Sequence, residues 1–325
     1  MNSLSLNGFL NASVINSVPD LKQQIADRAQ EATSGFQADL VSHLNGRIDQ
    51  ALLSDRAINE NKADQARLDL RNIRLSITDN TLTSLRDLTG GLSLEMQSAI
   101  GVTDVPRQNA VAAEAKEAIS EVLSRLNARH GERFLFSGDA TATPPFGDAE
   151  TLLNDIRNIG LTAVDEVDYA AQIQTYFNDP AGGFQTSFYQ GSQTASDGDA
   201  VLSNQQAFAD LFQGLTVLAL ADTSENQPYA QAGNPALDQA LSRLEGARTA
   251  IVDIQADVGI RQSSLQNEQA RLEREETLLA AAFLDLAGKD QYEAATQLRE
   301  LEANLEASYL LTTRLSNLSL LIYLR

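Results

Sequence analysis

The stretch LQNEQARLEREETLLAAAFLDL, residues 265–286, repeats leucine at every seventh position, at Leu265, Leu272, Leu279 and Leu286. Charged and amide side chains fill many of the positions between them, so these leucines share one side of a helix. A heptad repeat of this length is typical of helices that pack as a coiled coil. The stretch therefore predicts a long helix with a narrow apolar seam.

A second apolar register follows Gly288, so Gly288 and the two residues after it predict a hinge between two helical segments. This register consists of Leu298, Leu301, Leu305, Ser308, Thr312, Leu315, Ser319 and Ile322. Near the other end of the chain, apolar residues also recur in steps of three and four, at Val18, Leu21, Ile25, Ala29, Ala32, Phe36, Leu40, Leu44, Ile48 and Leu52. Because each pattern makes one helical stripe, we expect the two ends of the chain to pack on each other.

Proline and aromatic residues divide the chain. Residues 20–105 and 236–325 contain no proline, as expected of long helices. Twelve of the 18 Phe and Tyr residues lie between Phe134 and Tyr229. The sequence predicts a mainly α, elongated fold, in which N- and C-terminal helices pair as a coiled coil and a helical bundle around a small α+β insertion. The expected domains are 1–40 with 285–325, 41–135 with 236–284, and 136–235.

Local patterns give finer expectations. A break is expected at Gly90-Gly91, where two glycines interrupt a helical stretch. Helices are predicted from about Arg107 to Arg133, over residues 148–160 and over residues 201–221. A strand is expected to begin within residues 166–177, and a hairpin strand within GGFQTSFYQGS, residues 182–192, where aromatic residues stand between glycines.

Composition and motifs exclude several functions. The formal net charge of −20 would repel a phosphate backbone, so nucleic-acid binding is not expected. The chain has no Cys, so thiolate metal sites and a Cys nucleophile are absent. His43 and His130 lack neighbours at ligand spacing, and Asp197-Gly198-Asp199 reads as a turn because no further calcium ligands follow. We expect no catalytic residues, no cofactor and no metal.

The two termini bear on export and membranes. The first basic residue is Lys22, so the start of the chain has no basic region of a signal peptide. Export would therefore need a secretion apparatus that does not use a signal peptide of this kind. Only ten uncharged residues separate Arg314 from Arg325, too few for the roughly 20 that span a bilayer. Membrane insertion is not expected.

The last helix is apolar on more than one side, although docking onto its own domain requires only one stripe. One explanation is a helix buried in the centre of the monomer. The other is a helix that orders only when further subunits surround it, because exposed leucines in water favour aggregation.

Two segments carry a resemblance to a known family. RFLFSGDATATPPF (residues 133–146) and KDQYEAATQLRELEANLEASYLLTTRLSNLSLLIYL (residues 289–324) are similar to segments of the flagellin superfamily of bacterial flagellar axial proteins. The first segment is most like the branch that joins the hook of the flagellum to its filament, and its family-like residues are Phe134, Phe136, Gly138, Pro145 and Phe146. The resemblance covers roughly residues 1–145 and 236–325. TSGFQADL (residues 33–40) lacks the basic residue and the proline turn that the family often carries.

The resemblance implies a structural, extracellular protein of the bacterial flagellum without catalysis. It implies type III export without a cleavable signal peptide, an export chaperone that holds the C-terminal region, and helical self-assembly. In the junction branch, the partners are the other hook-associated junction protein and flagellin. The implied assembly residues are Val18, Leu21, Ile25 and Phe36 in the N-terminal helix, and Leu301, Leu305, Tyr309, Leu311, Leu315, Leu318, Leu321 and Ile322 in the C-terminal helix.

Three alternatives stay open. A divergent flagellin would form the filament itself rather than the junction. A cytoplasmic coiled-coil regulatory protein would use paired helical arms equally well, but it would not need the segment from Phe134 to Phe146. An enzyme would require a pocket with clustered polar groups in the middle of the chain.

Overall fold

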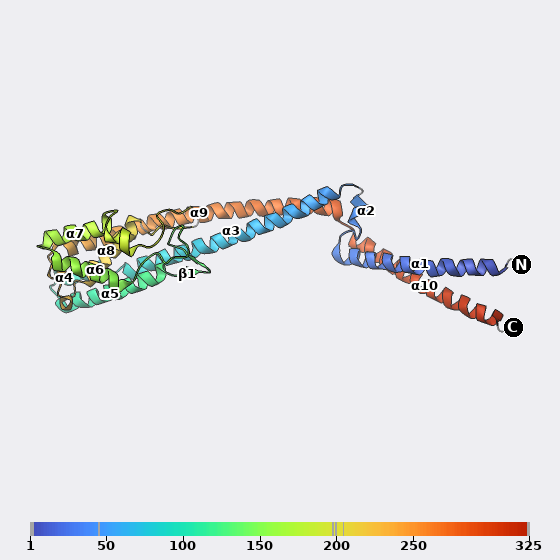
Figure 1. The fold of residues 1–325 in the computed structure, drawn as a ribbon, viewed down its shortest axis with the longest axis horizontal. Coiled ribbons are helices and arrows are strands. Elements are labelled where there is room, and N and C mark those ends of the chain that lie inside the picture. Colours follow the sequence, from blue (N-terminus) through green and yellow to red (C-terminus); the bar gives the residue numbers. More distant parts are fainter. Residues whose placement is uncertain (1–2, 45, 197, 199, 204, 324–325) are drawn as a thin grey trace. The chain divides into compact units, whose positions relative to one another are not determined.

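The computed structural model describes the backbone of residues 3–44, 46–196, 198, 200–203 and 205–323, and the side chains of these residues except 3–17 and 315–323. Helices dominate the described residues, and the mainly α fold predicted from the sequence is confirmed (Figure 1). The helices are α1 (Ser3–Ser34), α2 (Leu40–Leu44), α3 (Ile48–Thr89), α4 (Leu92–Gly101), α5 (Val105–Leu126), α6 (Ala149–Thr162), α7 (Glu166–Asn178), α8 (Gln206–Ala219), α9 (Pro235–Ala287) and α10 (Gln291–Tyr323).

Short strands and helical turns lie between the longer helices. The strands β1 (Arg129–His130) and β2 (Arg133–Phe134) form an antiparallel pair. A π-helix, η1, spans Phe184–Phe188, and two 3-10 helices, η2 and η3, span Thr223–Glu225 and Pro228–Ala230. The residues divide into two compact units, one up to Ala66 and from Ala270 on, the other Arg67–Gln269.

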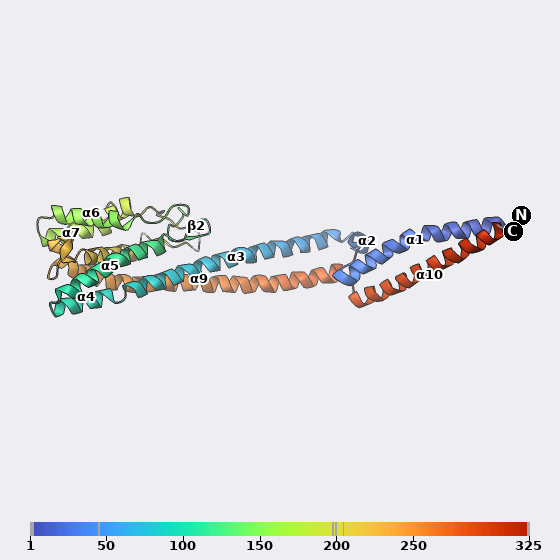
Figure 2. The same ribbon diagram turned by 90° about the horizontal axis from the view of Figure 1, so that it is seen from below.

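In the first unit, α1 and α10 lie side by side (Figures 1 and 2). The expected pairing of the two ends of the chain is thus confirmed. The register predicted for the C-terminal helix faces inward as far as its side chains are described. Partly buried residues include Val18, Leu21 and Ile25 on α1, and Leu298, Leu301, Leu305, Ser308 and Thr312 on α10.

The second unit has a continuous apolar core, to which α5 and α8 contribute long buried faces. Helices α6 and α7 pack against α8. Phe146 lies among four aromatic rings, with centroid distances of 6.1 Å to Phe184, 5.4 Å to Phe188, 5.7 Å to Tyr189 and 5.0 Å to Phe212. Aromatic pairs at such distances add to the free energy gained by burial alone.

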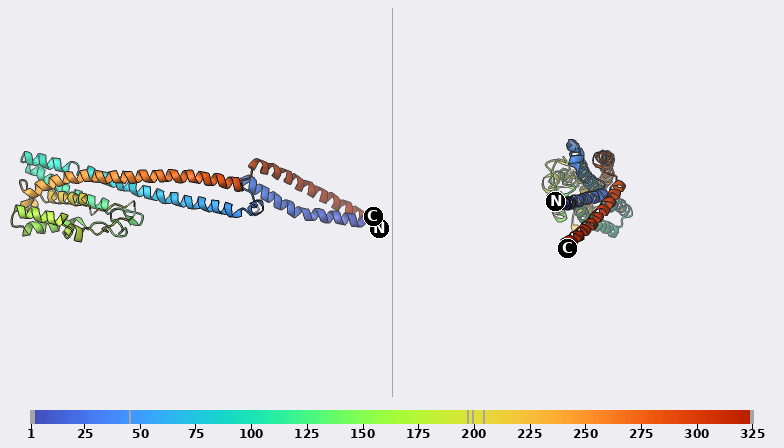
Figure 3. Two further views of the ribbon diagram at one scale, coloured as in Figure 1. Left: turned by 90° about the horizontal axis from the view of Figure 1, so that it is seen from above. Right: turned by 90° about the vertical axis from the view of Figure 1, so that its right-hand side faces the viewer.

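Helices α3 and α9 run beside each other (Figure 3), and polar contacts accompany their apolar seam. In the second unit, the side chain of Gln255 bonds Thr83 at 2.9 Å, Gln262 bonds Ser76 at 3.4 Å and Gln269 bonds Asp69 at 2.6 Å. The three glutamines of α9 are seven residues apart, and so are their three partners on α3, which run in the opposite direction along the sequence. We call these three contacts the polar ladder. Polar groups at fixed heptad positions specify the register of a coiled coil.

The predicted leucine heptad is partly confirmed by burial. Leu265 and Leu272 are 6 % and 5 % exposed, whereas Leu279 and Leu286 are only half-buried. The break at Gly90-Gly91 is also confirmed, because α3 ends at Thr89 and α4 begins at Leu92.

Two strand predictions in the middle of the chain are wrong. Residues 166–177 lie in helix α7, where the Asp165 carboxylate caps the helix by accepting from the N–H of Val167 at 3.0 Å. Tyr169, Ile173 and Phe177 are spaced by four and form its buried face.

Residues 182–192 contain the π-helix η1 instead of a hairpin strand. In this segment, Tyr189 forms an isolated bridge with Phe146. A Cβ atom on Gly183 would overlap the ring of Tyr176, so glycine lets η1 approach the end of α7 closely. The helix predicted to reach Arg133 ends earlier, at Leu126, and the helix expected from residue 201 begins at Gln206.

Candidate assembly surfaces

Two connecting segments meet in the first unit, one between α1 and α2 and one between α9 and α10. Gly35 ends α1 with φ of 75°, a left-handed conformation that glycine adopts without strain. The N–H of Gln37 then donates to the carbonyl of Ala287, and the N–H of Lys289 donates to the carbonyl of Gly35, both at 2.9 Å. We call residues 31–38 and 283–290 the joint.

Side chains reinforce the joint. The ring of Phe36 lies 5.5 Å from that of Phe283. Glu31 is only 2 % exposed, and its carboxylate pairs with Arg28 and accepts from the N–H of Ala38 at 3.1 Å. Burial of a carboxylate is tolerated here because its oxygens have hydrogen-bond donors. The segment predicted as a hinge after Gly288 is therefore held by contacts to the segment that follows α1.

An apolar groove of about 340 Å³ lies beside the joint. It is formed by α2, the start of α3 and one aromatic side chain of α9. At its edge, Leu52 is 67 % exposed. The groove is lined by Leu40, Leu44, Ile48, Ala51, Leu52, Asp55 and Phe283.

The described part of the C-terminal helix is apolar on two sides. Leu301 and Leu305 lie in the half-buried seam. Tyr309, Leu310 and Leu311 are 45 %, 57 % and 55 % exposed. The structure thus places predicted assembly residues both in the seam and on the outer face of the helix. The side chains of Leu315, Leu318, Leu321 and Ile322 lie outside the described residues.

The family-like segment, residues 133–146, folds into the second unit. The carbonyl of Phe136 accepts from the Oγ of Ser203 at 2.6 Å. Gly138 has φ of 60°, and a Cβ atom there would lie 2.5 Å from the carbonyl oxygen of Thr194. Phe136, Gly138, Pro145 and Phe146 are buried and Phe134 is half-buried. These side chains serve internal packing in the isolated chain.

Polar contacts fix the end and the middle of this segment. Phe146 exchanges two hydrogen bonds of 3.0 Å with the side chain of Asn127, the residue that ends α5. The carboxylate of Asp139 accepts from the N–H of Ser196 and from the hydroxyl of Thr194, both at 2.7 Å. These bonds stabilise the charged form and lower the pKa of Asp139.

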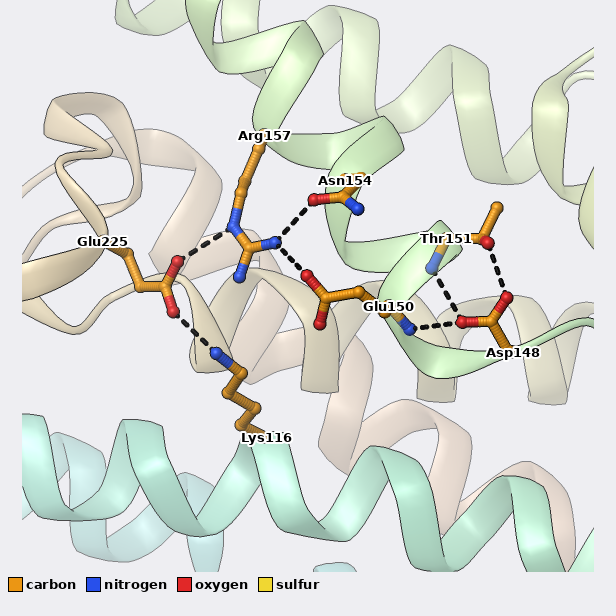
Figure 4. A network of polar contacts seen from close by, with 7 residues as sticks. All are labelled: Lys116, Asp148, Glu150, Thr151, Asn154, Arg157 and Glu225. Carbon is orange, nitrogen blue, oxygen red and sulfur yellow. Dashed lines mark hydrogen bonds and ion pairs between the residues drawn. The ribbon is translucent and has the colours of Figure 1, made fainter.

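A network of charges ties three elements of the second unit together (Figure 4). The carboxylate of Glu225 on η2 binds Lys116 of α5 at 2.8 Å and Arg157 of α6 at 2.9 Å. Arg157 also binds Glu150 at 2.9 Å. Burial favours a higher pKa for Glu225, but the bonds from Arg157 and Lys116 outweigh it and hold that pKa below its ordinary value.

This network was not predicted from the sequence, since its members lie far apart in the chain. The Asp148 carboxylate beside it caps α6 by accepting from the N–H groups of Glu150 and Thr151, at 2.9 and 3.0 Å. An Asp directly before a helical pattern is the one signal that could have located this corner. Every member has a structural partner, so the network acts as a clamp on the connection between α8 and α9.

In the part of the chain that the structure describes, no group of three or more His, Asp or Glu side chains could hold a metal ion. His43 is exposed on α2, and His130 is half-buried in β1. Of the described helices, none combines the length and the apolar character that a bilayer crossing requires.

Comparison with protein families addresses the C-terminal helices directly. Residues 241–324, which comprise most of α9 and all of α10, match the family described as the bacterial flagellin C-terminal helical region. Residues 241–324 are thus similar to the C-terminal region of flagellins. The flagellin resemblance predicted for the end of the chain is therefore confirmed.

Other comparisons add little to this flagellin-like region. No curated protein matches the chain. Among solved structures, a similar one is the crystal structure of Bacillus cereus FlgL, at 15 % sequence identity and a TM-score of 0.45. The similarity covers 71 % of this chain and 96 % of that chain.

Proposed function

We propose that this protein is a structural subunit of the bacterial flagellum that acts by helical self-assembly, and that it forms the junction between hook and filament. The observation that carries the first part is the flagellin C-terminal region at residues 241–324. The proposed role is mechanical and involves no catalysis. A divergent flagellin, which would build the filament, is the second candidate, because the same region is shared by that class.

The two-sided tail supports assembly. Tyr309, Leu310 and Leu311 are about half-exposed, although the seam of α10 already packs beside α1. Full burial of a fully exposed leucine is worth about 1.5–3 kcal/mol. The half-exposed leucines can still gain part of this free energy if neighbouring subunits bury the outer face that α1 leaves in water. We propose that an export chaperone covers this face inside the cell.

The remaining parts of the proposal concern location and organisation. The protein is exported without a cleavable signal peptide and functions in the extracellular flagellum. Residues 1–40 with 285–325 form the assembly layer, residues 41–135 with 236–284 form a bundle, and residues 136–235 form the variable insertion. The partners are further copies of the chain, flagellin and the other hook-associated junction protein.

The junction role is supported by the resemblance of residues 133–146 to that branch. It is tested by position and copy number, because a junction protein forms a short band whereas a flagellin fills the filament. Antibody labelling of isolated flagella should mark only the end of the hook. Labelling along the whole filament would overturn the junction role and favour the flagellin.

Self-assembly is tested by removing residues 309–325. The truncated protein should keep the thermal unfolding transition of the second unit and should no longer enter flagella. A finer variant replaces Tyr309, Leu310 and Leu311 with Ser. Its matched control replaces Leu161, Val164 and Val167 with Ser, since these residues of the second unit are 75 %, 83 % and 65 % exposed. Normal flagella from the tail variants would contradict the proposal.

A further inference from the structure

The apolar groove beside the joint exposes one side of α3. Ile48, Leu52 and Asp55 line it at intervals of four and three residues, so they follow one another along the same side of the helix. Ile48 and Leu52 are 39 % and 67 % exposed. Of the described residues that line the groove, Asp55 alone is charged. No basic side chain of the described residues pairs with its carboxylate, which accepts from the amide of Asn59 at 3.3 Å.

The outer side of α10 carries the same kinds of residue in the reverse order. Leu310 and Arg314 are each two residues from Thr312 of the seam, about 200° around the helix, so both point away from α1. Leu310 is 57 % exposed, and Arg314 is exposed without an acidic partner among the described residues. Leu318 and Leu321 stand four and seven positions after Arg314, the spacing of one helical side.

Charge and spacing make the groove and this helix end complementary. The chain has a net charge of −20, yet residues 307–325 contain two arginines and no acidic residue. In an antiparallel arrangement, Arg314 can meet Asp55 while the leucines after it reach the apolar floor of the groove. In a parallel arrangement with the same ion pair, those leucines would lie beyond Asp55 and outside the groove. Opposite charges at an interface suppress wrong partners and fix register.

The end of α10 in the same copy cannot fill the groove. Helix α10 begins at the joint, where the N–H of Lys289 donates to the carbonyl of Gly35 at 2.9 Å. Helix α1 ends there and packs beside α10, so α10 extends away from the joint. With a rise of about 1.5 Å per residue, Arg314 lies roughly 35 Å along the helix from Gln291. A helix end that enters the groove therefore comes from another copy.

We infer that the end of α10 of one copy docks antiparallel to α3 in the groove of a second copy. Arg314 of the incoming helix lies beside Asp55, and the leucines four and seven positions after it lie over Leu52 and Ile48. This inference rests on the proposed self-assembly and specifies one of its contacts. A copy whose helix end is bound still offers its own groove. Such a heterologous contact continues into a ring or a helical filament rather than closing as a dimer.

Point variants of neighbouring residues test the groove. Leu52→Asp places a charge in the groove and should raise the concentration needed for assembly by about tenfold or more, because central interface residues commonly have effects of this size. Leu53→Asp is the matched control, since Leu53 is 65 % exposed on the same helix but does not line the groove. Circular dichroism and thermal unfolding establish that both variants are folded. Equal effects of the two changes on assembly would overturn the inference.

Reversal of charge tests the partner and the register. Asp55→Arg and Arg314→Asp should each weaken assembly, and the chain with both changes should recover it because the ion pair is restored with opposite polarity. Asp49→Arg is the control, since Asp49 is exposed on α3 and does not line the groove. It should not rescue Arg314→Asp. Rescue by Asp49→Arg as strong as that by Asp55→Arg would contradict the proposed register.

Crosslinking of purified protein identifies the occupant of the groove. The chain has no Cys, so Leu52→Cys and Leu318→Cys each introduce a single thiol. A short thiol-to-thiol crosslinker should join these two variants faster than it joins Leu53→Cys to Leu318→Cys. A chain with both Leu52→Cys and Leu318→Cys should link between copies, and a link within one copy would overturn the inference.

The same experiment separates this contact from the proposed function. A wild-type chain that assembles, while Leu52→Cys and Leu318→Cys do not crosslink, would overturn the inference and leave self-assembly standing. A chain that neither assembles nor crosslinks would overturn both.

Discussion

Phe36 and Gly288 pair as an isolated antiparallel bridge, although 251 positions of the chain separate them. The bridge joins the segment that follows α1 to the segment that follows α9. The flanking hydrogen bonds join Gln37 to Ala287 and Lys289 to Gly35. Neither connecting segment can therefore move alone without breaking backbone hydrogen bonds. The joint therefore couples the orientation of α1 to that of α10.

Substitution of Gly288 should loosen this joint. A Cβ atom at Gly288 would press into the carbonyl oxygen of Leu284, so Gly288→Ala must shift the backbone at the end of α9. We expect a loss of about 1–3 kcal/mol of local stability, seen as faster hydrogen exchange at Gln37 and Lys289. The control is Gly246→Ala in the same helix, where nothing lies within 4 Å and the change should be neutral or stabilising.

Gly138 and Gly131 provide a matched pair for the family-like segment. Their φ values are nearly equal, 60° and 61°, but only Gly138 is surrounded by other atoms. Gly131→Ala should cost about 1 kcal/mol, since alanine is strained at positive φ. Gly138→Ala should cost clearly more, because its Cβ would also contact Thr194 and Leu202. Urea unfolding of the second unit measures both, and equal losses would show that backbone strain alone matters.

Phe146 should be the most sensitive aromatic residue of the second unit. It is 2 % exposed and contacts the rings of Phe184, Phe188 and Phe212. Phe146→Ala should lower the free energy of unfolding by about 3–5 kcal/mol, because removal of a buried ring leaves a cavity. Phe134→Ala is the control, since Phe134 is only half-buried. A similar loss from both variants would contradict the central place of Phe146.

Long-range periodicity and the helix at residues 148–160 were readable from the sequence, whereas much of the rest of the compact middle was not. The leucine heptad and the Gly90-Gly91 pair correctly indicated long helices and a break between them. The strand expected at residues 166–177 is wrong because Tyr169, Ile173 and Phe177 recur every four residues, and because Asp165 is a helix cap.

Other features depend on residues that are distant in the chain. The early end of α5 at Leu126 follows from the pairing of Asn127 with Phe146, which no local pattern announces. The contact of Glu225 with Lys116 and Arg157 is equally non-local. The polar ladder, by contrast, was visible in principle, since Gln255, Gln262 and Gln269 stand exactly one heptad apart in the sequence.

The clamp at Glu225 should make the second unit sensitive to acid. The pKa of Glu225 is lowered in the folded chain, so its contribution is present above the unfolded value near 4.5 and is lost as pH falls through the lower, folded value. Glu225→Gln should therefore cost about 1–3 kcal/mol at pH 7 and progressively less as the pH falls below 4.5. Thermal unfolding as a function of pH measures the difference. The control is Glu121→Gln, whose partner Arg125 lies in the same helix at the surface.

The polar ladder should determine register more than stability. Gln262 lies in the middle of the ladder and is partly buried. Gln262→Leu would replace a weak hydrogen bond to Ser76 with apolar contact, so it should change the free energy of unfolding by less than about 1 kcal/mol.

Replacing Gln255, Gln262 and Gln269 together with Leu removes the groups that mark one alignment of α3 on α9, and it adds apolar surface at heptad spacing. We expect this triple variant to stay helical but to populate oligomers, because unmarked heptads pair with other copies. Gln266→Leu is the matched control, since Gln266 is exposed on the same helix outside the ladder. Sedimentation and thermal unfolding distinguish the outcomes, and a strictly monomeric triple variant with unchanged unfolding would show that the leucine seam alone sets the register.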